Sequence, residues 1–517
     1  MDERKKSYFG LVGVIALAMA TELNEQVSEQ SLPDVMGGLG LSHDPAIWFN
    51  SLYISAEVIG MSLGPWLGIT FTLRRFSVFV AHLAMISAAL IPLTQNLTLL
   101  YGLRIIEGLA GGFAVPLLMT IALRVLDPPI RLYGLAAYAL TATFFPNLSA
   151  SLSGLWTDLV DWRFVFWQAV PLCSMAAVML WYGIPSEAPK YARFKIFDWR
   201  GAFLILVGMG ALSTLLQQGD RFDWFNSPTI CILALIGFGG VPLFVINEWY
   251  HPLPLFKFQL LKRRNFAYGA TTLLIFVVIA LSSSTLPADF LREVAGYRPE
   301  QAYLVTLEVA CMQLVMLPAM AVVLNQEWVD SRVVSLIGMT FMLAACIGDS
   351  FLTSVWNRNE FYLWQFCQGL GESMIVMPLL MMSTNALVPA EGPFAAAMVN
   401  TPRAIAETIG IWMVQLIHRW RGSLHSDRIT DQIGRNRYRL YQANNPAWQH
   451  PAPLKPDGSL RSQDSLIEFK AQIAKQTAVL TLSDSFMVIA AIVVFLMVWV
   501  LVVPQRTYPP RINFIQK

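Results

Sequence analysis

The most informative residues of this 517-residue chain are charged side chains that stand inside long apolar runs. An ionised side chain at the centre of a bilayer costs at least about 2.5–3.5 kcal/mol, so such residues usually face a bundle interior or a water-filled cavity. The candidates for binding protons or a cationic ligand are Glu22, Glu25, Glu29, Glu57, Arg104, Glu107, Asp289, Glu308, Glu372, Arg403 and Glu407.

Three of these carboxylates are spaced to share one side of a helix. At 100° per residue, Glu25 and Glu29 lie within roughly 60° of Glu22. A carboxyl group in a low-dielectric cavity beside another carboxyl binds a proton more tightly than it does in water. It can load a proton on one side of a membrane and release it on the other, and a cationic substrate that competes for it couples the two fluxes. The spacing therefore predicts the chemistry of an antiporter.

Two pairs of opposite charge follow helical spacing. Arg104 and Glu107 are three residues apart, and Arg403 and Glu407 are four apart, so each pair can neutralise itself locally. A structural or gating role and a direct role in transport both remain open for these pairs. Asp289 lies near the predicted outer end of its apolar run, where contact with water alone would account for a charge.

The composition identifies the environment of these residues. The chain has 55% hydrophobic and 14% charged side chains, whereas soluble proteins carry about 25% charge. Its 36 Lys and Arg against 34 Asp and Glu exclude a nucleic-acid binder with a basic face. The apolar residues come in blocks of roughly 18–25, the length that crosses a bilayer as a helix. We therefore expect a polytopic membrane protein whose constant partner is the lipid bilayer.

Apolar runs and their breakers predict fourteen spans. They lie at about 9–32, 46–70, 76–95, 98–123, 131–154, 162–184, 201–217, 228–248, 266–290, 301–324, 333–353, 360–387, 394–418 and 484–503. The stretch 419–483 is too polar to span and is interpreted as a hydrophilic loop, with an amphipathic helical pattern near its end. The cysteines show neither metal-site spacing nor a disulfide framework.

The distribution of Lys and Arg predicts the orientation. An even number of spans puts both termini on one side, and the short loops on that side carry 19 Lys and Arg against 5 on the other. Because positive loops stay in the cytoplasm, both termini are predicted to be cytoplasmic. The 419–483 stretch then lies outside.

Several short motifs carry a resemblance to a known family. They are Leu103-Arg104-Ile105-Ile106-Glu107-Gly108, Asp161-Trp162-Arg163-Phe164-Val165-Phe166 with Pro171, Phe197-Asp198-Trp199-Arg200-Gly201, Arg264-Asn265-Phe266, Asp330 with Arg332, and Arg403 with Gly410. In their order and spacing they resemble the major facilitator superfamily, in particular its fourteen-span drug/proton antiporters of the EmrB/QacA type.

The chain departs from that family pattern at informative places. Asn24, counted back from Pro33, stands where the family usually has an aspartate, and Glu107 replaces the glutamine of R-x-x-Q-G. The loop at 68–75 lacks the aspartate of the family motif G-x-x-x-D-R-x-G-R-R and keeps only its basic end. The fifth-span motif at 146–154 has fewer of the glycines of the family pattern G-P-x-x-G-G. Three acids are unusual for the family and hint at a particular substrate or altered coupling: Glu22, Glu57 and Glu372.

The resemblance implies an all-α polytopic membrane protein with the major facilitator fold. Residues 1–184 and 266–517 would form two six-helix bundles around a midplane cavity, and 185–265 an inserted helix pair with its linkers. In the EmrB-like branch the transporter works with a periplasmic adaptor and an outer-membrane channel, for which the 419–483 loop would be a docking element. The QacA-like branch works alone.

The predicted function is therefore that of a secondary active transporter of the inner (cytoplasmic) membrane and not of an enzyme. We expect proton-coupled efflux of hydrophobic, cationic small molecules such as drugs, with protons as coupling ion and no cofactor or metal. Glu25 is the first candidate for binding the proton or a cation, assisted by Glu22 and Glu29. A dedicated exporter of an endogenous metabolite or siderophore is the alternative. A membrane-embedded enzyme would need a His/Asp constellation that the scattered histidines do not offer.

Overall fold

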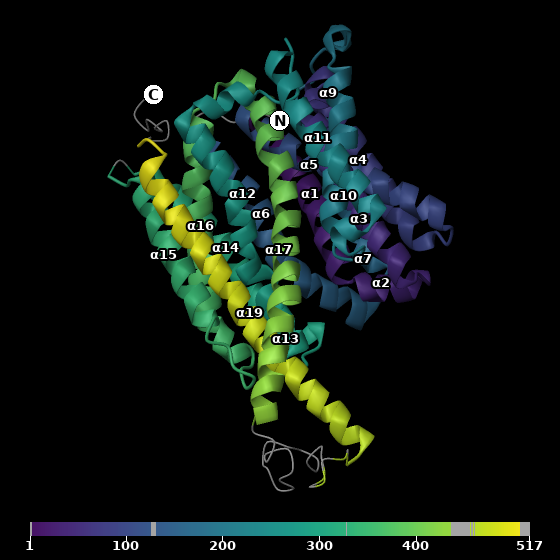
Figure 1. The fold of residues 1–517 in the computed structure, drawn as a ribbon. Coiled ribbons are helices and arrows are strands. Elements are labelled where there is room, and N and C mark those ends of the chain that lie inside the picture. The colour runs from purple at the N-terminus through teal and green to yellow at the C-terminus, as the bar shows by residue number, and fades with distance from the viewer. Residues whose placement is uncertain are drawn as a thin grey trace.

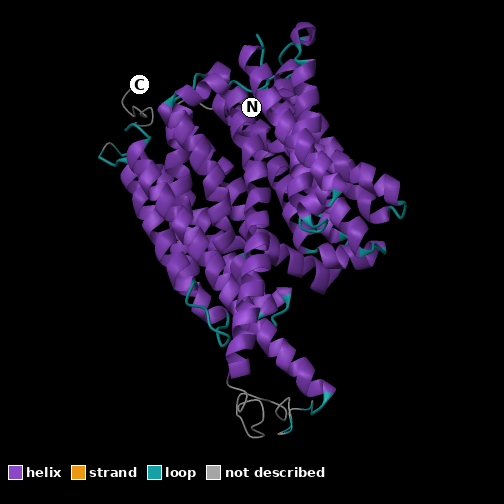
Figure 2. Ribbon diagram, viewed as in Figure 1, coloured by secondary structure: helices purple, strands orange, loops and turns teal. Residues whose placement is uncertain are grey.

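The computed structural model describes residues 3–125, 131–326, 328–435 and 461–506, together with residues 455, 457 and 459. Within these residues the regular structure is helical, and none of them forms a strand (Figure 2). The short 3-10 and π segments are η1 (Ile91–Leu93), η2 (Leu155–Val160), η3 (Tyr191–Ile196), η4 (Ile205–Met209), η5 (Trp224–Asn226), η6 (Phe258–Lys262) and η7 (Pro389–Glu391).

The first six predicted spans are all helical. They correspond to α1 (Glu3–Gln30), α3 (His43–Phe71), α4 (Leu73–Leu90), α5 (Leu97–Val125), α6 (Arg131–Gly154), and α7 with α8 (Phe164–Trp167 and Ala169–Gly183). A short additional helix, α2 (Leu32–Leu39), has a proline in its first turn and ends at Gly40, whose φ of 65° is a left-handed conformation that glycine adopts without strain.

The inserted pair is formed by α9 (Trp199–Leu204), η4, α10 (Gly210–Gln218) and α11 (Pro228–Tyr250). Asp198 begins α9 as an N-cap, because its side chain accepts a hydrogen bond from the backbone N–H of Gly201 at 2.8 Å. The Phe197-Asp198-Trp199-Arg200-Gly201 motif is thus a helix-start signal.

The last six predicted spans are helical as well. They are α12 with α13 (Arg264–Ser284 and Leu286–Glu293), α14 (Pro299–Leu324), α15 (Ser331–Asp349), α16 (Arg358–Asn385), α17 (Gly392–Arg435) and α19 (Gln463–Val502). Asp330 caps α15 by accepting from the backbone N–H of Arg332 at 3.0 Å. As Figure 1 shows, α1 begins and α19 ends at the same end of the molecule.

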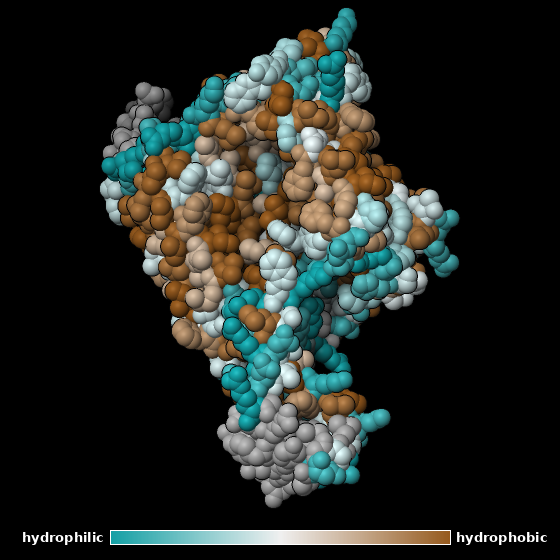
Figure 3. Space-filling model, viewed as in Figure 1, coloured by the Kyte–Doolittle hydropathy of each residue, from teal (hydrophilic) through white to brown (hydrophobic). Residues whose placement is uncertain are grey.

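Eleven helical segments of the described residues are long and apolar enough to cross a membrane. The other three predicted spans, α1, α6 and α17, are also helical. On the face shown in Figure 3, a hydrophobic belt covers the middle of the molecule, and hydrophilic residues lie above and below it. The prediction of an all-α polytopic membrane protein is confirmed.

Helix contacts are arranged in two groups. Within the first, α1 packs against α5, α6 and α8, and α3 packs along α5; within the second, α16 packs against α12, α14 and α15. The groups meet where α6 contacts α14 and where α17 contacts α3 and α5. The approach of α3 to α5 depends on Gly108 and Gly112, since a Cβ there would collide with the carbonyl oxygens of Tyr53 and Glu57.

The interpretation of 419–483 as a loop is wrong for much of that stretch. Residues 419–435 continue α17, and 463–483 form the first half of α19. Both helices extend past the hydrophobic belt, where they cross and their ends diverge (Figures 1 and 3). Polarity excludes a membrane span but not a helix, and the charged side chains join the pair: Asp484 of α19 accepts from Arg421 and contacts His425, both at 2.6 Å. The predicted amphipathic helix lies within α19.

Candidate functional site

Three carboxylates of α1 line the boundary between the two groups of helices. Glu22 and Glu25 are buried, and Glu29 is half-buried. Each is met by a residue from another helix, namely Arg403 of α17 for Glu22, Glu57 of α3 for Glu25 and Asn50 of α3 for Glu29. The predicted face of α1 is therefore the centre of the candidate site.

A buried ion pair crosses this boundary. Arg403 Nη2 lies 3.0 Å from Glu22 Oε1, and both side chains are 4% exposed. Arg403 Nη1 also donates to Thr141 Oγ1 of α6 at 3.1 Å. The local pairing of Arg403 with Glu407 does not form. Arg403 points across the boundary to Glu22, and Glu407, one helical turn further on, accepts from Gln26 of α1 at 3.1 Å.

Glu25 and Glu57 form a second contact, between α1 and α3. Both are buried, and their carboxyl groups lie close enough to interact with one another. An ionised carboxylate can only accept hydrogen bonds, so a hydrogen bond between two carboxyl groups requires a proton on one of them. The pair can therefore hold and exchange a proton or, with both groups ionised, receive a cation.

The predicted local pair of α5 does form. Arg104 Nη1 lies 2.6 Å from Glu107 Oε2, and Nη2 donates to Ser28 Oγ of α1 at 2.7 Å. The guanidinium lies 4.6 Å from the ring centre of Phe49 and 4.2 Å from that of Tyr53, in cation–π geometry. Arg104 is completely buried, so the rings and hydrogen bonds replace the water it has lost.

Asn24 completes this group, because its side-chain amide donates to Glu107 Oε1. Compared with the family motifs, the carboxylate and the amide have exchanged helices: the amide is on α1 and the carboxylate on α5. Asn24, Ser28 and Thr141 were not among the predicted site residues. All three are polar residues within apolar runs, and that pattern could have identified them. The prediction considered only charged residues and therefore missed them.

A cavity of about 170 Å³ adjoins this cluster. Its wall includes Glu29 of α1, Asn50 of α3, Gln217 of α10 and Trp412 of α17. Ligand pockets for drug-sized molecules measure about 300–1,000 Å³, so in this conformation the cavity holds only part of such a ligand. The inserted pair contributes to the wall through α10.

Three of the predicted site residues lie apart from this cluster. Glu372 is enclosed within the second group of helices and accepts from Gln313 at 3.0 Å. Asp289 pairs with Arg292 at 2.8 Å, and both side chains have contact with solvent. Glu308 is half-buried, and its Oε2 has no hydrogen-bond partner.

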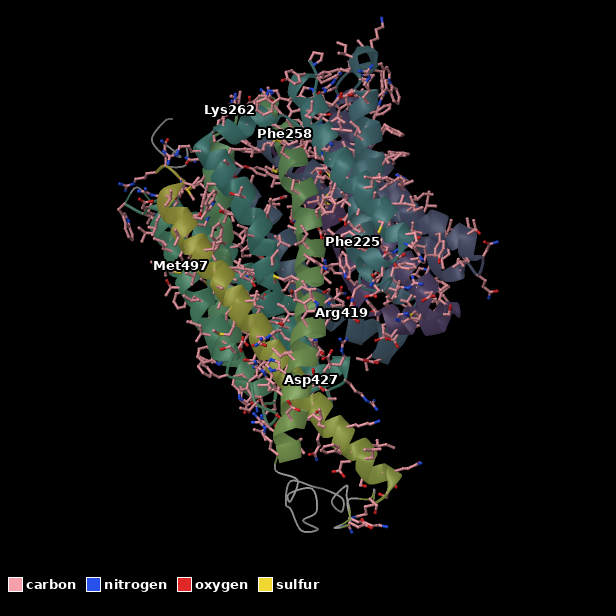
Figure 4. The ribbon with its side chains drawn as sticks, in the orientation of Figure 1. Phe225, Phe258, Lys262, Arg419, Asp427 and Met497 are labelled. Carbon is pink, nitrogen blue, oxygen red and sulfur yellow. The ribbon has the colours of Figure 1, made fainter. Side chains whose placement is uncertain are left out.

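The turn between α10 and α11 ties the two groups together beside the cavity. Arg221 pairs with Asp44 of the α3 terminus at 2.8 Å, whereas Asp220 and Asp223 pair with Arg419 of α17 at 3.0 and 2.5 Å. Figure 4 shows Arg419 on α17 and Phe225 in the neighbouring turn. The hydrogen bond from Arg419 lowers the pKa of Asp223 below its ordinary value.

The residues of this chain match a model of the Major Facilitator Superfamily from 8 to 411. The chain belongs to this superfamily. The resemblance drawn from the sequence motifs is thereby confirmed, and the protein is a multi-pass membrane transporter of the superfamily.

Curated members of the superfamily align with most of the chain. The multidrug export protein EmrB of Escherichia coli K12 is 24% identical over 436 residues, 82% of this chain and 83% of that protein. The probable multidrug resistance protein EmrY of the same organism is 26% identical over 497 residues, 94% of each chain. The fatty acid resistance protein FarB of Neisseria gonorrhoeae is 24% identical over 431 residues, 81% of this chain and 82% of that protein.

Solved structures share the fold. The human organic anion transporter MFSD10 (TETRAN) superposes with a TM-score of 0.56 at 12% identity and covers 94% of this chain and 99% of its own. A double tryptophan mutant of XylE gives 0.53 at 13% identity, over 98% and 97% of the two chains. The two-bundle fold of the superfamily is therefore that of this chain.

Proposed function

We propose that this major facilitator transporter exports hydrophobic, cationic small molecules, drugs among them, from the cytoplasm in exchange for protons. The contact between Glu25 and Glu57 carries the proposal, since it is a buried site that holds either a proton or a cationic group. The multidrug export and resistance proteins among its relatives support drugs as the substrate class.

The exchange follows from the charge balance of this pair. With one proton, Glu25 and Glu57 are bridged and carry one negative charge. A cationic substrate that enters beside them is stabilised by two ionised carboxylates, so its binding favours loss of the shared proton. When the cavity opens to the more acidic side, a proton returns and the substrate cation loses its partner.

The neighbouring ion pairs would connect the exchange of substrate and proton to the movement of the two bundles. Glu22 lies one helical turn from Glu25 on α1 and holds Arg403 of α17 across the boundary. A cation bound at Glu25 competes electrostatically with Arg403 for the same carboxylates, which weakens the connection between the bundles. Arg104 and Glu107 fix the facing side of α1 through Ser28 and Asn24, so that the α1 carboxylates keep their positions.

Transport in proteoliposomes under an imposed pH gradient tests the proposal. We expect accumulation of a lipophilic cation in the wild-type vesicles to require the gradient. Glu25→Gln should abolish the response to the gradient, and Arg104→Ala should lower flux strongly. Glu360→Gln, which removes an exposed carboxyl at the start of α16, should leave both unchanged. Flux indifferent to the gradient and to the first two changes would refute the antiport mechanism.

We further propose that the protein lies in the inner membrane with both termini in the cytoplasm. The extension of α17 and α19, defined here as residues 419–435 and 463–483, then lies in the periplasm. It is a suitable surface for an adaptor protein that continues the export route. A phosphatase domain inserted after Arg435 should be active only on the periplasmic side. Activity of that fusion in the cytoplasm would show that the protein has the opposite orientation.

A further inference from the structure

The C-terminal bundle contains a second group of buried acids, away from the boundary between the bundles. Asp349 ends α15 and is 1% exposed, and Glu372 lies in the middle of α16 and is fully buried. The hydrogen-bond partners of both carboxyls are neutral side chains. A carboxylate that is buried without a cation or a proton is strongly unfavourable.

Asp349 belongs to a polar network with two glutamines of α16 and a serine of α12. Gln365 Nε2 lies 3.3 Å from Asp349 Oδ2 and 3.5 Å from the carbonyl oxygen of Ser282 on α12. Gln368, three residues further along α16, donates to Ser282 Oγ. Both glutamines therefore converge on the same point of α12.

Glu372 continues this polar line one turn further along α16. Ser283, next to Ser282, donates to Glu372 Oε1, and Gln313 of α14 donates to Oε2 at 3.0 Å. Gln313 also donates to the carbonyl oxygen of Gly369 at 3.1 Å. The contacts join Asp349 at the end of the bundle to Glu372 in its interior.

Acceptor atoms in this network outnumber the donors. Four buried oxygens have no hydrogen-bond partner: Asp349 Oδ1, Gln365 Oε1, Gln368 Oε1 and Gln313 Oε1. Unpartnered acceptors are costly when buried, and most buried polar atoms in proteins have partners. The unpartnered oxygens are the second observation, beside the acids themselves, that indicates a bound cation.

We propose that Asp349 and Glu372 form a second proton-binding site of the transporter, inside the C-terminal bundle. A hydronium ion transfers a proton to Asp349 Oδ1 and leaves as water, and the new O–H bond neutralises the carboxyl and supplies a donor. Asp349 is the last residue of α15, and the exposed Phe351 lies in the turn that follows it. Glu372 is the inner member of the pair.

The surroundings do not match a site for zinc or another transition metal. No group of three or more His, Cys, Asp or Glu side chains that could hold a metal occurs in the described residues. The titratable groups near Asp349 are the thiols of Cys346 and Cys367, and Asp484 of α19 is occupied by Arg421 and His425. Nothing among these partners supplies a positive charge to the two acids.

Infrared difference spectroscopy of the purified transporter tests this site without substrate or transport. At neutral pH we expect an absorption band of protonated carboxyl groups, from which Asp349→Asn and Glu372→Gln each remove a component. Glu360→Gln, on the same helix but exposed, should leave the band unchanged. Each variant is first compared with the wild type by size-exclusion chromatography, and either variant that folds is sufficient for the test.

Two results would overturn the proposal. One is an unchanged band in the variants that fold. The other is loss of the Asp349 and Glu372 components from the wild-type band when choline is replaced by Na⁺, which would identify a metal cation as the occupant. Because the measurement involves no transport, the site can be confirmed even if the proposed antiport fails, and antiport can hold if this site does not exist.

Discussion

Arg403 of α17 and Glu22 of α1 form an ion pair with 3.0 Å between Nη2 and Oε1, and each side chain is only 4% exposed. The two residues are 381 positions apart in the chain and belong to different bundles. Thr141 of α6 holds the same guanidinium at 3.1 Å, so one cation connects α17 to two helices of the opposite bundle.

Removal of Glu22 should destabilise this conformation severely. Glu22→Gln leaves Arg403 buried without its counter-ion, for which we expect a loss of about 3 kcal/mol. Glu22→Gln combined with Arg403→Gln removes both charges and should cost less than the single change. Denaturant unfolding in detergent micelles compares wild type, Glu22→Gln, Arg403→Gln and the double variant as a double-mutant cycle. Additive losses would show that the two residues are not coupled.

An exchange variant tests the reversed positions of Asn24 and Glu107. Asn24→Asp alone puts two carboxyl groups beside Arg104, and Glu107→Gln alone leaves Arg104 without a carboxylate. The double variant restores one carboxylate and one amide, on the opposite helices. We expect its transport rate to exceed that of both single variants by about tenfold, equal to about 1.4 kcal/mol. If the double variant transports no faster than the slower single variant, Asn24 and Glu107 are not interchangeable in this way.

The close contact of α3 and α5 predicts a sharp difference between two glycines of one helix. A Cβ at Gly112 would collide with the carbonyl oxygen of Glu57, whereas no atom lies within 4 Å of a Cβ at Gly102. Gly112→Ala should therefore separate the helices, cost about 1–3 kcal/mol and displace Glu57 from Glu25. Gly102→Ala is the matched control. Equal thermal stability and transport in both variants would exclude the expected strain.

A pH dependence follows from the contacts of Glu391, in the turn before α17. Burial raises its pKa, but hydrogen bonds from Arg263 and Lys257 outweigh burial and lower the pKa to about 2. Because this value lies below the ordinary 4.5, the stabilising contribution is complete above pH 4.5 and disappears as the pH falls towards 2.

Glu391→Gln measures that contribution. We expect its melting temperature to lie about 2 °C below that of wild type near neutral pH, since ion pairs with contact to solvent contribute little. The difference should shrink steadily as the pH falls below 4.5. Scanning fluorimetry over an acid pH series provides the comparison, and a difference that grows in acid would be the opposite of this expectation.

The sequence was sufficient for the spans and for the face of α1. Length and apolarity decide where a helix crosses a bilayer, and the spacing of Glu22, Glu25 and Glu29 decides which side they share. The motif residues Asp198 and Asp330 are understood as well, since each caps a helix through a local hydrogen bond.

Partners across the bundles could not be predicted in the same way. Arg403 has Glu407 at helical spacing, yet its guanidinium contacts Glu22, and the choice depends on how α17 is rotated against α1. Such rotations result from the packing of whole helices against each other, and the spacing of residues along one helix carries no information about that packing. The helical extension was missed for another reason, because hydropathy reports on membrane crossing and not on helix formation.

The unbroken course of α17 has a mechanical consequence. From Arg403 to Arg435 the helix continues for 32 residues, or about 48 Å at 1.5 Å per residue. Pro402, which interrupts the hydrogen bonding of the helix, lies directly before this length and is a natural pivot. A tilt of one degree at Arg403 therefore displaces the far tip by about 0.8 Å. If α17 moves as a rigid rod about Pro402, a small rearrangement at the buried Arg403 becomes a larger displacement at the far end of the helix.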